Sequence, residues 1–235
     1  MALTLEQQVK KLLGINAVQN LMSKFQYYYT VGDFDKLKDM FWPGDDTECE
    51  LPDGRYIGID QIRELAFGMP PVPPELMEKL KAEGGGENPN AAPGRLQLHT
   101  LTTPVIEVAD DAKTAKALWL SPGIETGGHE GDLAGSWAWE KFAVDFICED
   151  DKWYFWHFRQ IDIFCCFFYK SWTDDFFAHN LMHVPEDADT VEKLYEFMES
   201  QNHSGNPLNR GYFYDQRVAP WLDVVPPEPY TSWNA

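Results

Sequence analysis

The chain of 235 residues has few basic side chains and no long apolar run. Lys and Arg total 19 against 38 Asp and Glu, which gives a formal net charge of -19. Because a strongly anionic chain is repelled by phosphate backbones and by anionic lipid surfaces, this balance predicts no nucleic-acid partner and no membrane partner. No segment approaches the roughly 20 apolar residues that a membrane-spanning helix needs, and the first residues show no basic stretch followed by an apolar one. We therefore expect a soluble protein without a membrane span or a signal peptide.

Cysteine is also scarce. The sequence contains only Cys49, Cys148, Cys165 and Cys166. They form no Cys-x-x-Cys pair and no regularly spaced framework, and the adjacent Cys165 and Cys166 fall in an aromatic stretch that is typical of a strand. This pattern predicts buried thiols and a reducing, cytoplasmic location.

The motifs of nucleotide, metal and serine chemistry are missing. The run 84–86 is three glycines but no Lys-Ser/Thr pair follows it, and the sequence has no Gly-x-Gly-x-x-Gly after a predicted strand and no Gly-x-Ser-x-Gly. His179 and His183 have the spacing of a metal-binding pair on a helix, yet no acidic residue stands between them. We expect no cofactor and no metal site.

A long amphipathic helix is expected at the start of the chain. Thr4 is a good N-cap, and Gln7 three residues later completes a capping box. The helix should run to about Thr30, because Gly32 provides a typical C-terminal stop. Apolar side chains spaced 3, 4, 3 and 4 residues apart form one stripe along it: Ile15, Val18, Met22, Phe25 and Tyr29.

The remaining pattern predicts an α+β fold. Short helices are expected over 33–41 and 59–67, a hairpin over 49–58, strands over 96–108, 112–121, 135–148 and 152–169, and a last helix over about 190–199. Consecutive strands joined by tight turns indicate an antiparallel meander, so the sheet should be strongly curved and folded over the N-terminal helices. Residues 1–170 then form one cone-shaped domain, with a proline- and glycine-rich insertion over 68–95 that we interpret as a lid. Residues 171–235 form an extension that packs on this domain or on a neighbouring subunit.

Histidines, phenols and indoles are the candidate site residues. His99 begins the first long strand after the insertion, next to the predicted lid, and we favour a functional role for it. Tyr28 and Tyr29 lie on the last turn of the first helix, where a structural role is equally compatible with the pattern. Many aromatic side chains in the strands suggest a roomy, apolar pocket for a ring-bearing ligand. The indoles expected to line it are those of Trp42, Trp119, Trp137 and Trp139.

The strand over 153–162 has a polar group on each face. Strict alternation puts His157 and Arg159 on the face that also carries Phe155, and it puts Gln160 and Asp162 on the other. A polar group among aromatic rings needs a partner, so one of these faces should carry a buried polar site. For His157 a structural role is the stronger interpretation.

The order of several short motifs resembles the SnoaL-like branch of the NTF2-like superfamily, over about Leu3 to Phe168. In chain order these motifs are the first long helix, the residues 32–35 that follow it, the hairpin that contains residues 54–58, His99 followed by residues 103–108, and residues 150–153. This resemblance implies an α+β cone with a deep pocket between sheet and helices, usually in an oligomer, here a dimer or trimer. Members include polyketide cyclases, ketosteroid-isomerase relatives, bile acid dehydratases and lyases for lignin-derived aromatics, and they generally use acid–base chemistry without cofactors.

The resemblance also marks a departure. The tyrosine and aspartate that the dehydratases carry at the helix end fall on Phe25 and Thr30 here, so the usual carboxylate base is missing and these two residues are expected only to contact substrate. The acid–base role should then pass to His99, with Tyr28 or Tyr29 as a hydrogen-bond donor and Arg159 or His157 stabilising charge. This reasoning predicts a cofactor-independent lyase or dehydratase that acts on a hydrophobic aromatic or polycyclic small molecule. The alternatives are an isomerase of the ketosteroid-isomerase type and a non-catalytic binding protein.

Overall fold

The computed structural model describes residues 2–67, 78, 82, 95–127, 134–169, 171–173 and 191–233. Nearly all of the predicted lid over 68–95 lies outside these residues, and so does the pair His179 and His183.

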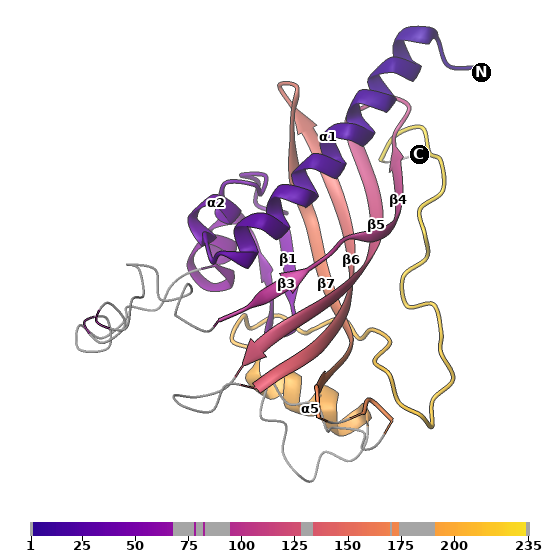
Figure 1. The fold of residues 1–235 in the computed structure, drawn as a ribbon. Coiled ribbons are helices and arrows are strands. Elements are labelled where there is room, and N and C mark those ends of the chain that lie inside the picture. Colours follow the sequence, from indigo (N-terminus) through magenta and orange to yellow (C-terminus); the bar gives the residue numbers. More distant parts are fainter. Residues whose placement is uncertain are drawn as a thin grey trace.

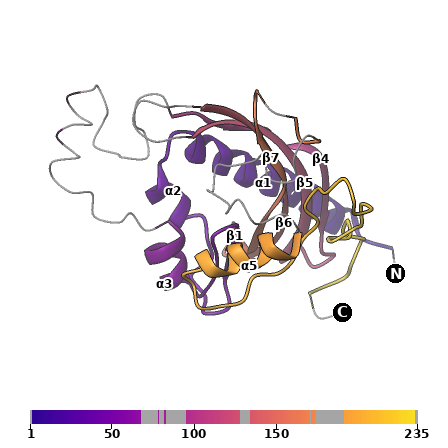
Figure 2. The same cartoon turned by 90° about the horizontal axis from the view of Figure 1, so that it is seen from below.

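Helix α1 (Leu5–Thr30) is the long helix that the sequence predicts. The Thr4 side chain accepts a hydrogen bond from the Gln7 backbone, and the Gln7 side chain accepts one from the Thr4 backbone, which completes the capping box. After the helix, Gly32 adopts a φ of 66°, a backbone conformation that glycine reaches without strain. Both ribbon views show α1 lying in the hollow of a curved sheet (Figures 1 and 2).

The sheet has seven strands, β1 (Glu48–Leu51), β2 (Gly54–Ile57), β3 (Gln97–His99), β4 (Thr102–Val108), β5 (Thr114–Gly127), β6 (Ala134–Glu149) and β7 (Lys152–Phe167). Their order is β2-β1-β7-β6-β5-β3, with β4 paired to β5 beside β3. Every pair is antiparallel except β1 with β7, so the predicted meander is confirmed. Short helices α2 (Phe34–Lys38), α3 (Ile59–Gln61) and the π-helix η1 (Ile62–Ala66) complete this half.

Strand β5 is longer than predicted. The strand was expected to end at residue 121, directly before the Pro122-Gly123 pair, whose composition is typical of a turn. In the structure both residues continue the ladder with β6, opposite Trp139 and Ala138. The extension carries Glu125 onto the sheet, where it becomes part of the site described below.

The face of the sheet that covers α1, the inner face, carries the core. Phe25 of α1 contacts Phe155 and Phe158, with ring centroids 5.6 and 4.7 Å apart. Strict alternation predicted that these two phenylalanines lie on opposite faces, and this is wrong. The β6–β7 register shifts between Asp145 and Phe146, and this bulge lets both rings point inward.

The C-terminal segment covers the opposite, outer face. Helix α5 (Val191–Gln201) is followed by an extended stretch that runs beside β5 and β4 (Figure 1). Its end is held by backbone hydrogen bonds from Asp110 to Tyr230 and from Asp111 to Thr231, and by a 3.0 Å bond between the Tyr230 and Thr114 hydroxyl groups. Among the described residues, no helix is both long and apolar enough to cross a membrane.

Candidate active site

His99 lies on the inner face, at the end of β3. Its imidazole rests against the backbone of Gly123 on β5, the residue opposite it in the ladder. A β-carbon at position 123 would stand 2.4 Å from His99 Nδ1, so only glycine leaves room for the ring. Gly123 of the turn-like Pro122-Gly123 pair therefore provides the space in which the His99 ring packs against the strand.

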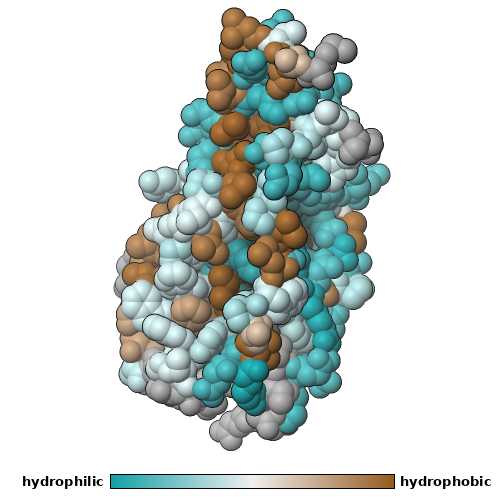
Figure 3. All heavy atoms as spheres, turned by 90° about the vertical axis from the view of Figure 1, so that its right-hand side faces the viewer, coloured by the Kyte–Doolittle hydropathy of each residue, from teal (hydrophilic) through white to brown (hydrophobic). Residues whose placement is uncertain are grey.

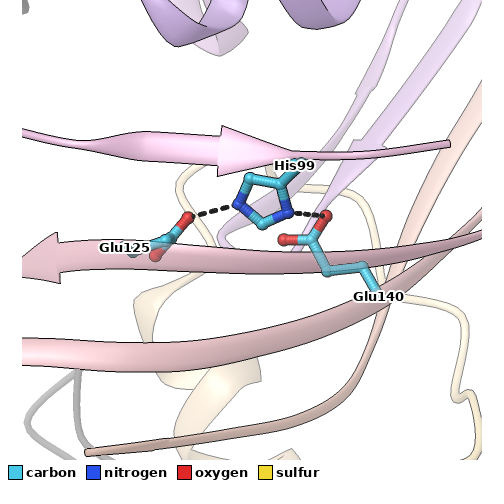
Figure 4. Close-up of side chains that lie close together, drawn as sticks. All are labelled: His99, Glu125 and Glu140. Atoms are coloured by element: carbon cyan, nitrogen blue, oxygen red, sulfur yellow. Dashed lines mark hydrogen bonds and ion pairs between the residues drawn. The ribbon is translucent and has the colours of Figure 1, made fainter. Parts of the chain in front are cut away.

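Two carboxylates flank the ring (Figure 4). Glu125 Oε1 lies 2.8 Å from His99 Nε2, and Glu140 Oε2 lies 3.4 Å from His99 Nδ1. The short contact is a hydrogen bond, and the tautomer that satisfies it carries its proton on Nε2 and donates to Glu125. Nδ1 then keeps its lone pair, and no described residue hydrogen-bonds to it. The arrangement orients the imidazole and leaves one basic nitrogen.

Glu140 belongs to a buried acidic pair on the neighbouring strands. It lies opposite Asp162 in the β6–β7 ladder, and its Oε1 accepts a 2.8 Å hydrogen bond from Gln160. Burial, followed by the negative charges of Asp162 and Glu125, raises the pKa of Glu140 well above its ordinary value. Burial and then the charge of Glu125 raise the pKa of Asp162 to about 6. Both effects favour the protonated form of Glu140, the form that can donate a proton.

Tyr29 is the phenol that faces this cluster. Its ring lies 6.4 Å from the imidazole of His99, centroid to centroid, in an edge-on arrangement. Burial, then the charges of Glu140 and Glu125, raise the pKa of Tyr29, so its hydroxyl stays protonated and can only donate or accept a hydrogen bond. Tyr28 points elsewhere: its ring lies under the Lys36 ammonium, 5.0 Å from the centroid.

The structure does not bring His157 and Arg159 to His99. Both lie on the outer face, because the parallel pairing of β1 with β7 places them opposite Glu48 and Glu50 while the intervening Phe158 points into the core. His157 contacts Asp145 at 3.0 Å, and Arg159 donates to the Asn209 carbonyl. Gln160 and Asp162 are the residues of this strand that face the cluster.

The residues expected to contact substrate are also dispersed. Phe25 is in the centre of the core, and the Thr30 hydroxyl donates back to the Gln26 carbonyl of its own helix. The four indoles lie in three places. Trp119 is buried and donates to Gln19, Trp42 donates to Glu149 at the end of β6, and Trp137 and Trp139 are outer-face residues with 37% and 36% of their surface exposed.

Sequence reasoning missed Glu125 and Glu140, and it named Asp162 only as one of the polar residues on a face of the strand over 153–162. Glu140 and Asp162 alternate correctly for the inner face, and an acidic residue amid aromatic strand residues is the signal that could have revealed them. Glu125 was hidden because the strand was expected to end four residues earlier. The site therefore has carboxylates from the sheet, whereas the carboxylate expected at the end of the first helix is absent.

The same cluster could hold a metal ion. His99, Glu125 and Glu140 each offer a ligand atom, and these atoms lie within 4.8 Å of one another. Imidazole and carboxylate groups together suit several divalent ions. The His99–Glu125 hydrogen bond accounts for the close approach of two of these groups without an ion.

Replacing Asp162 with asparagine should stabilise the protein above pH 6. Its folded-state pKa of about 6 lies above the ordinary value of 3.8, so the folded state binds the proton more tightly than the unfolded one. Stability is therefore lost as pH rises between these two values, by about 1 to 2 kcal/mol once coupling to Glu140 is allowed for. Thermal unfolding at pH 7.5 should occur a few degrees higher in Asp162→Asn, and at pH 3.5 the difference should vanish.

The control is Asp145→Asn, which removes the half-exposed partner of His157 on the outer face and should bring no gain. An Asp162→Asn protein that is less stable than the parent at pH 7.5 would show that the carboxylate is needed for folding.

Fold and site together define an α+β protein with a buried acid–base cluster between one helix and a curved sheet. The comparisons identify the family: the SnoaL-like domain matches residues 10–159, and the chain belongs to this family, which binds hydrophobic small molecules. The predicted resemblance and the predicted fold class are confirmed.

The chain is also similar, at low identity, to several solved structures. A putative scytalone dehydratase from Novosphingobium aromaticivorans is 13% identical, with 76% of this chain and 99% of that one covered and a TM-score of 0.48. LinA is 15% identical, with 68% and 92% covered and a TM-score of 0.47. An NTF2-like superfamily protein from Salmonella enterica is 15% identical, with 64% and 91% covered and a TM-score of 0.47. Among curated proteins, no sequence matches the chain.

Proposed function

We propose that the protein is a cofactor-independent lyase that acts on a hydrophobic aromatic or polycyclic small molecule. Among lyases, a dehydratase fits the site best. One observation carries the proposal: His99 stands between a carboxylate that orients it and a second, buried carboxyl group whose surroundings raise its pKa and so favour its protonated form. A base and an acid held side by side are what the elimination of water needs, because one proton leaves carbon while another joins the departing oxygen.

The roles follow from the contacts. His99 Nδ1 removes the proton from carbon, and Glu125 stabilises the imidazolium that forms. Glu140 protonates the leaving oxygen, and Tyr29 donates a hydrogen bond to developing negative charge. His157 and Arg159 have no part in this scheme because they lie on the other face of the sheet.

The test is a mass-loss assay on a panel of hydrophobic aromatic alcohols, run in the presence of EDTA and compared with the His99→Ala protein. Loss of one water that requires His99 and survives EDTA supports the proposal. Deuterium uptake from solvent without loss of mass supports the isomerase instead. Ligand binding with neither reaction supports a binding protein, and a reaction abolished by EDTA contradicts the cofactor-independent mechanism.

We also propose that the protein is a homo-oligomer, a dimer or trimer. The first turns of α1 expose a stripe of aliphatic side chains, Leu5, Val9, Leu12 and Leu13, and Figure 3 shows hydrophobic atoms gathered at the upper end of the molecule, where α1 begins. An exposed apolar stripe of this kind is typical of an interaction surface. Light scattering after gel filtration should give a mass of two or three times the 27.0 kDa of one chain, and Leu12→Glu should lower it. A parent protein that elutes as a monomer would contradict this.

The cytoplasmic location stays part of the proposal. It is supported by four cysteines that form no disulfide. Cell fractionation that recovers the protein outside the cytoplasm would refute it.

A further inference from the structure

Two buried polar side chains, those of Gln26 in α1 and Ser121 in β5, have no hydrogen-bond partner in the part of the chain that the structure describes. Both atoms of the Gln26 side-chain amide and the hydroxyl group of Ser121 are closed to solvent and hydrogen-bond to no described residue. Gln26 as a whole is 7% exposed and Ser121 is 0% exposed. Leaving a buried donor or acceptor unpaired costs about 1 to 3 kcal/mol, so such groups call for an explanation.

The contacts between α1 and β5 indicate that Gln26 and Ser121 lie at the same level along the strand. Gln19 of α1 accepts a hydrogen bond from Trp119 of β5, and nearly three turns later Tyr29 contacts His99, which is opposite Gly123 of β5. The helix therefore advances along β5 in the direction from 119 to 123. Gln26 lies seven residues after Gln19, on the same stripe of the helix, so it faces the strand between these two contacts.

Ser121 is the inner-face residue of β5 in that interval. Across the sheet it pairs with Glu140, the carboxyl group that faces His99. The Gln26 amide, the Ser121 hydroxyl group and His99 Nδ1 are thus three polar groups of this stretch of helix and sheet that hydrogen-bond to no described residue, and Nδ1 has the 3.4 Å contact with Glu140. Because all are closed to solvent, a ligand reaches them only after the surrounding side chains move apart.

The chemistry of these groups selects the ligand. The amide offers a donor and an acceptor, and the serine hydroxyl offers both as well. An anion would meet the charges of Glu125 and Asp162, and a carbonyl oxygen could satisfy only the donors. A hydroxyl group both donates and accepts, and it is neutral.

We propose that Gln26 and Ser121 form a hydroxyl-binding site that holds the departing oxygen of the substrate beside Glu140. The inference rests on the proposed function and names its substrate class: an alcohol whose hydroxyl group is one carbon away from an acidic C–H bond. Gln26 and Ser121 position the oxygen, and they are specificity residues that do not transfer protons.

The step balances. The C–H bond breaks and its proton goes to His99 Nδ1, while its electron pair forms the carbon–carbon double bond. The C–O bond breaks, and the oxygen takes its electron pair and the proton of Glu140 to leave as water. The 3.4 Å contact between His99 Nδ1 and Glu140 then lets the proton return, which restores both groups without an outside reagent.

The experiment uses a matched pair of fluorescent ligands, 2-naphthol and naphthalene, which differ only in the hydroxyl group. We expect the parent protein at pH 7 to bind 2-naphthol about 5- to 100-fold more tightly, the range for one or two net hydrogen bonds. In Gln26→Met combined with Ser121→Ala this ratio should fall to near one. Thermal unfolding of Gln26→Met alone should occur at the parent temperature or above it, since no paired group is lost.

The matched control is Gln19→Met, one heptad earlier on the same stripe. Its amide already has Trp119 as a partner, so this variant should lose stability and keep the ligand ratio. A ratio near one in the parent, or a ratio unchanged in the double variant, overturns the hydroxyl site. The failures of the two proposals are distinguishable. A ligand ratio that depends on Gln26, in a parent protein whose turnover does not depend on His99, would support the hydroxyl site and contradict the proposed function.

Discussion

Replacing His99 with alanine should lower kcat by about 10²- to 10⁴-fold, the usual contribution of one positioned acid–base group. The alcohol that loses water in the mass-loss assay serves as substrate. The effect should fall on kcat more than on KM, because the proton transfer is made only in the transition state. The small side chain leaves Glu125 without its partner, so thermal unfolding is measured in parallel to confirm that the variant is folded.

The chain offers a close control in His157. This histidine also contacts a carboxylate, Asp145, at 3.0 Å, but it lies on the outer face among Trp156 and Trp233. His157→Ala should leave kcat within a few-fold of the parent. Equal losses in both variants would mean that the histidines act through the fold, and full turnover in His99→Ala would remove His99 from the mechanism.

Local patterns predicted the framework of the fold well. The capping box of Thr4 and Gln7, the glycine after α1 and the turn between β1 and β2 are all signals that neighbouring residues make by themselves, and each is confirmed. The long strands were equally readable because β-branched and aromatic residues mark them without reference to the rest of the chain.

Errors arose where pairing between distant strands decides the outcome. The bulge opposite Asp145 changes which face Phe155 occupies, and no residue nearby in the sequence indicates that a bulge occurs there. Likewise Pro122-Gly123 has the composition of a turn, yet hydrogen bonds to β6 keep it extended. Both features depend on register, which sequence alone specifies weakly.

The sequence predicted only part of the candidate site, for the same reason. His99 and Tyr29 could be found as unusual residues on expected elements, and the structure brings them together. The carboxylates come from residues 26 and more positions away in sequence, so only the folded sheet shows that they flank the histidine. The indoles did not mark the site, because a large ring can equally lie in the core, as Trp119 does, or on the outer face, as Trp137 and Trp139 do.

Replacing Glu140 with glutamine should lower kcat by a similar factor, about 10²- to 10⁴-fold, with little change in KM. Glutamine has the same shape and can still bond to Gln160, but it cannot give up a proton to a leaving oxygen. Glu50→Gln is the control, since burial also raises the pKa of Glu50 while its carboxylate binds Asn209 on the outer face, away from His99. Equal activity of Glu140→Gln and the parent would exclude Glu140 as the proton donor.

The position of Glu140 also predicts the stereochemistry. Its oxygen and His99 Nδ1 are 3.4 Å apart, so acid and base reach the substrate from one side. An anti elimination would need the two groups on opposite faces of the substrate, with the ring system between them. Substrate diastereomers that carry deuterium on one face of the carbon next to the alcohol should therefore lose the label that is syn to the hydroxyl group. Loss of the anti label would place the base elsewhere, and it would do so even if both substitutions abolished turnover.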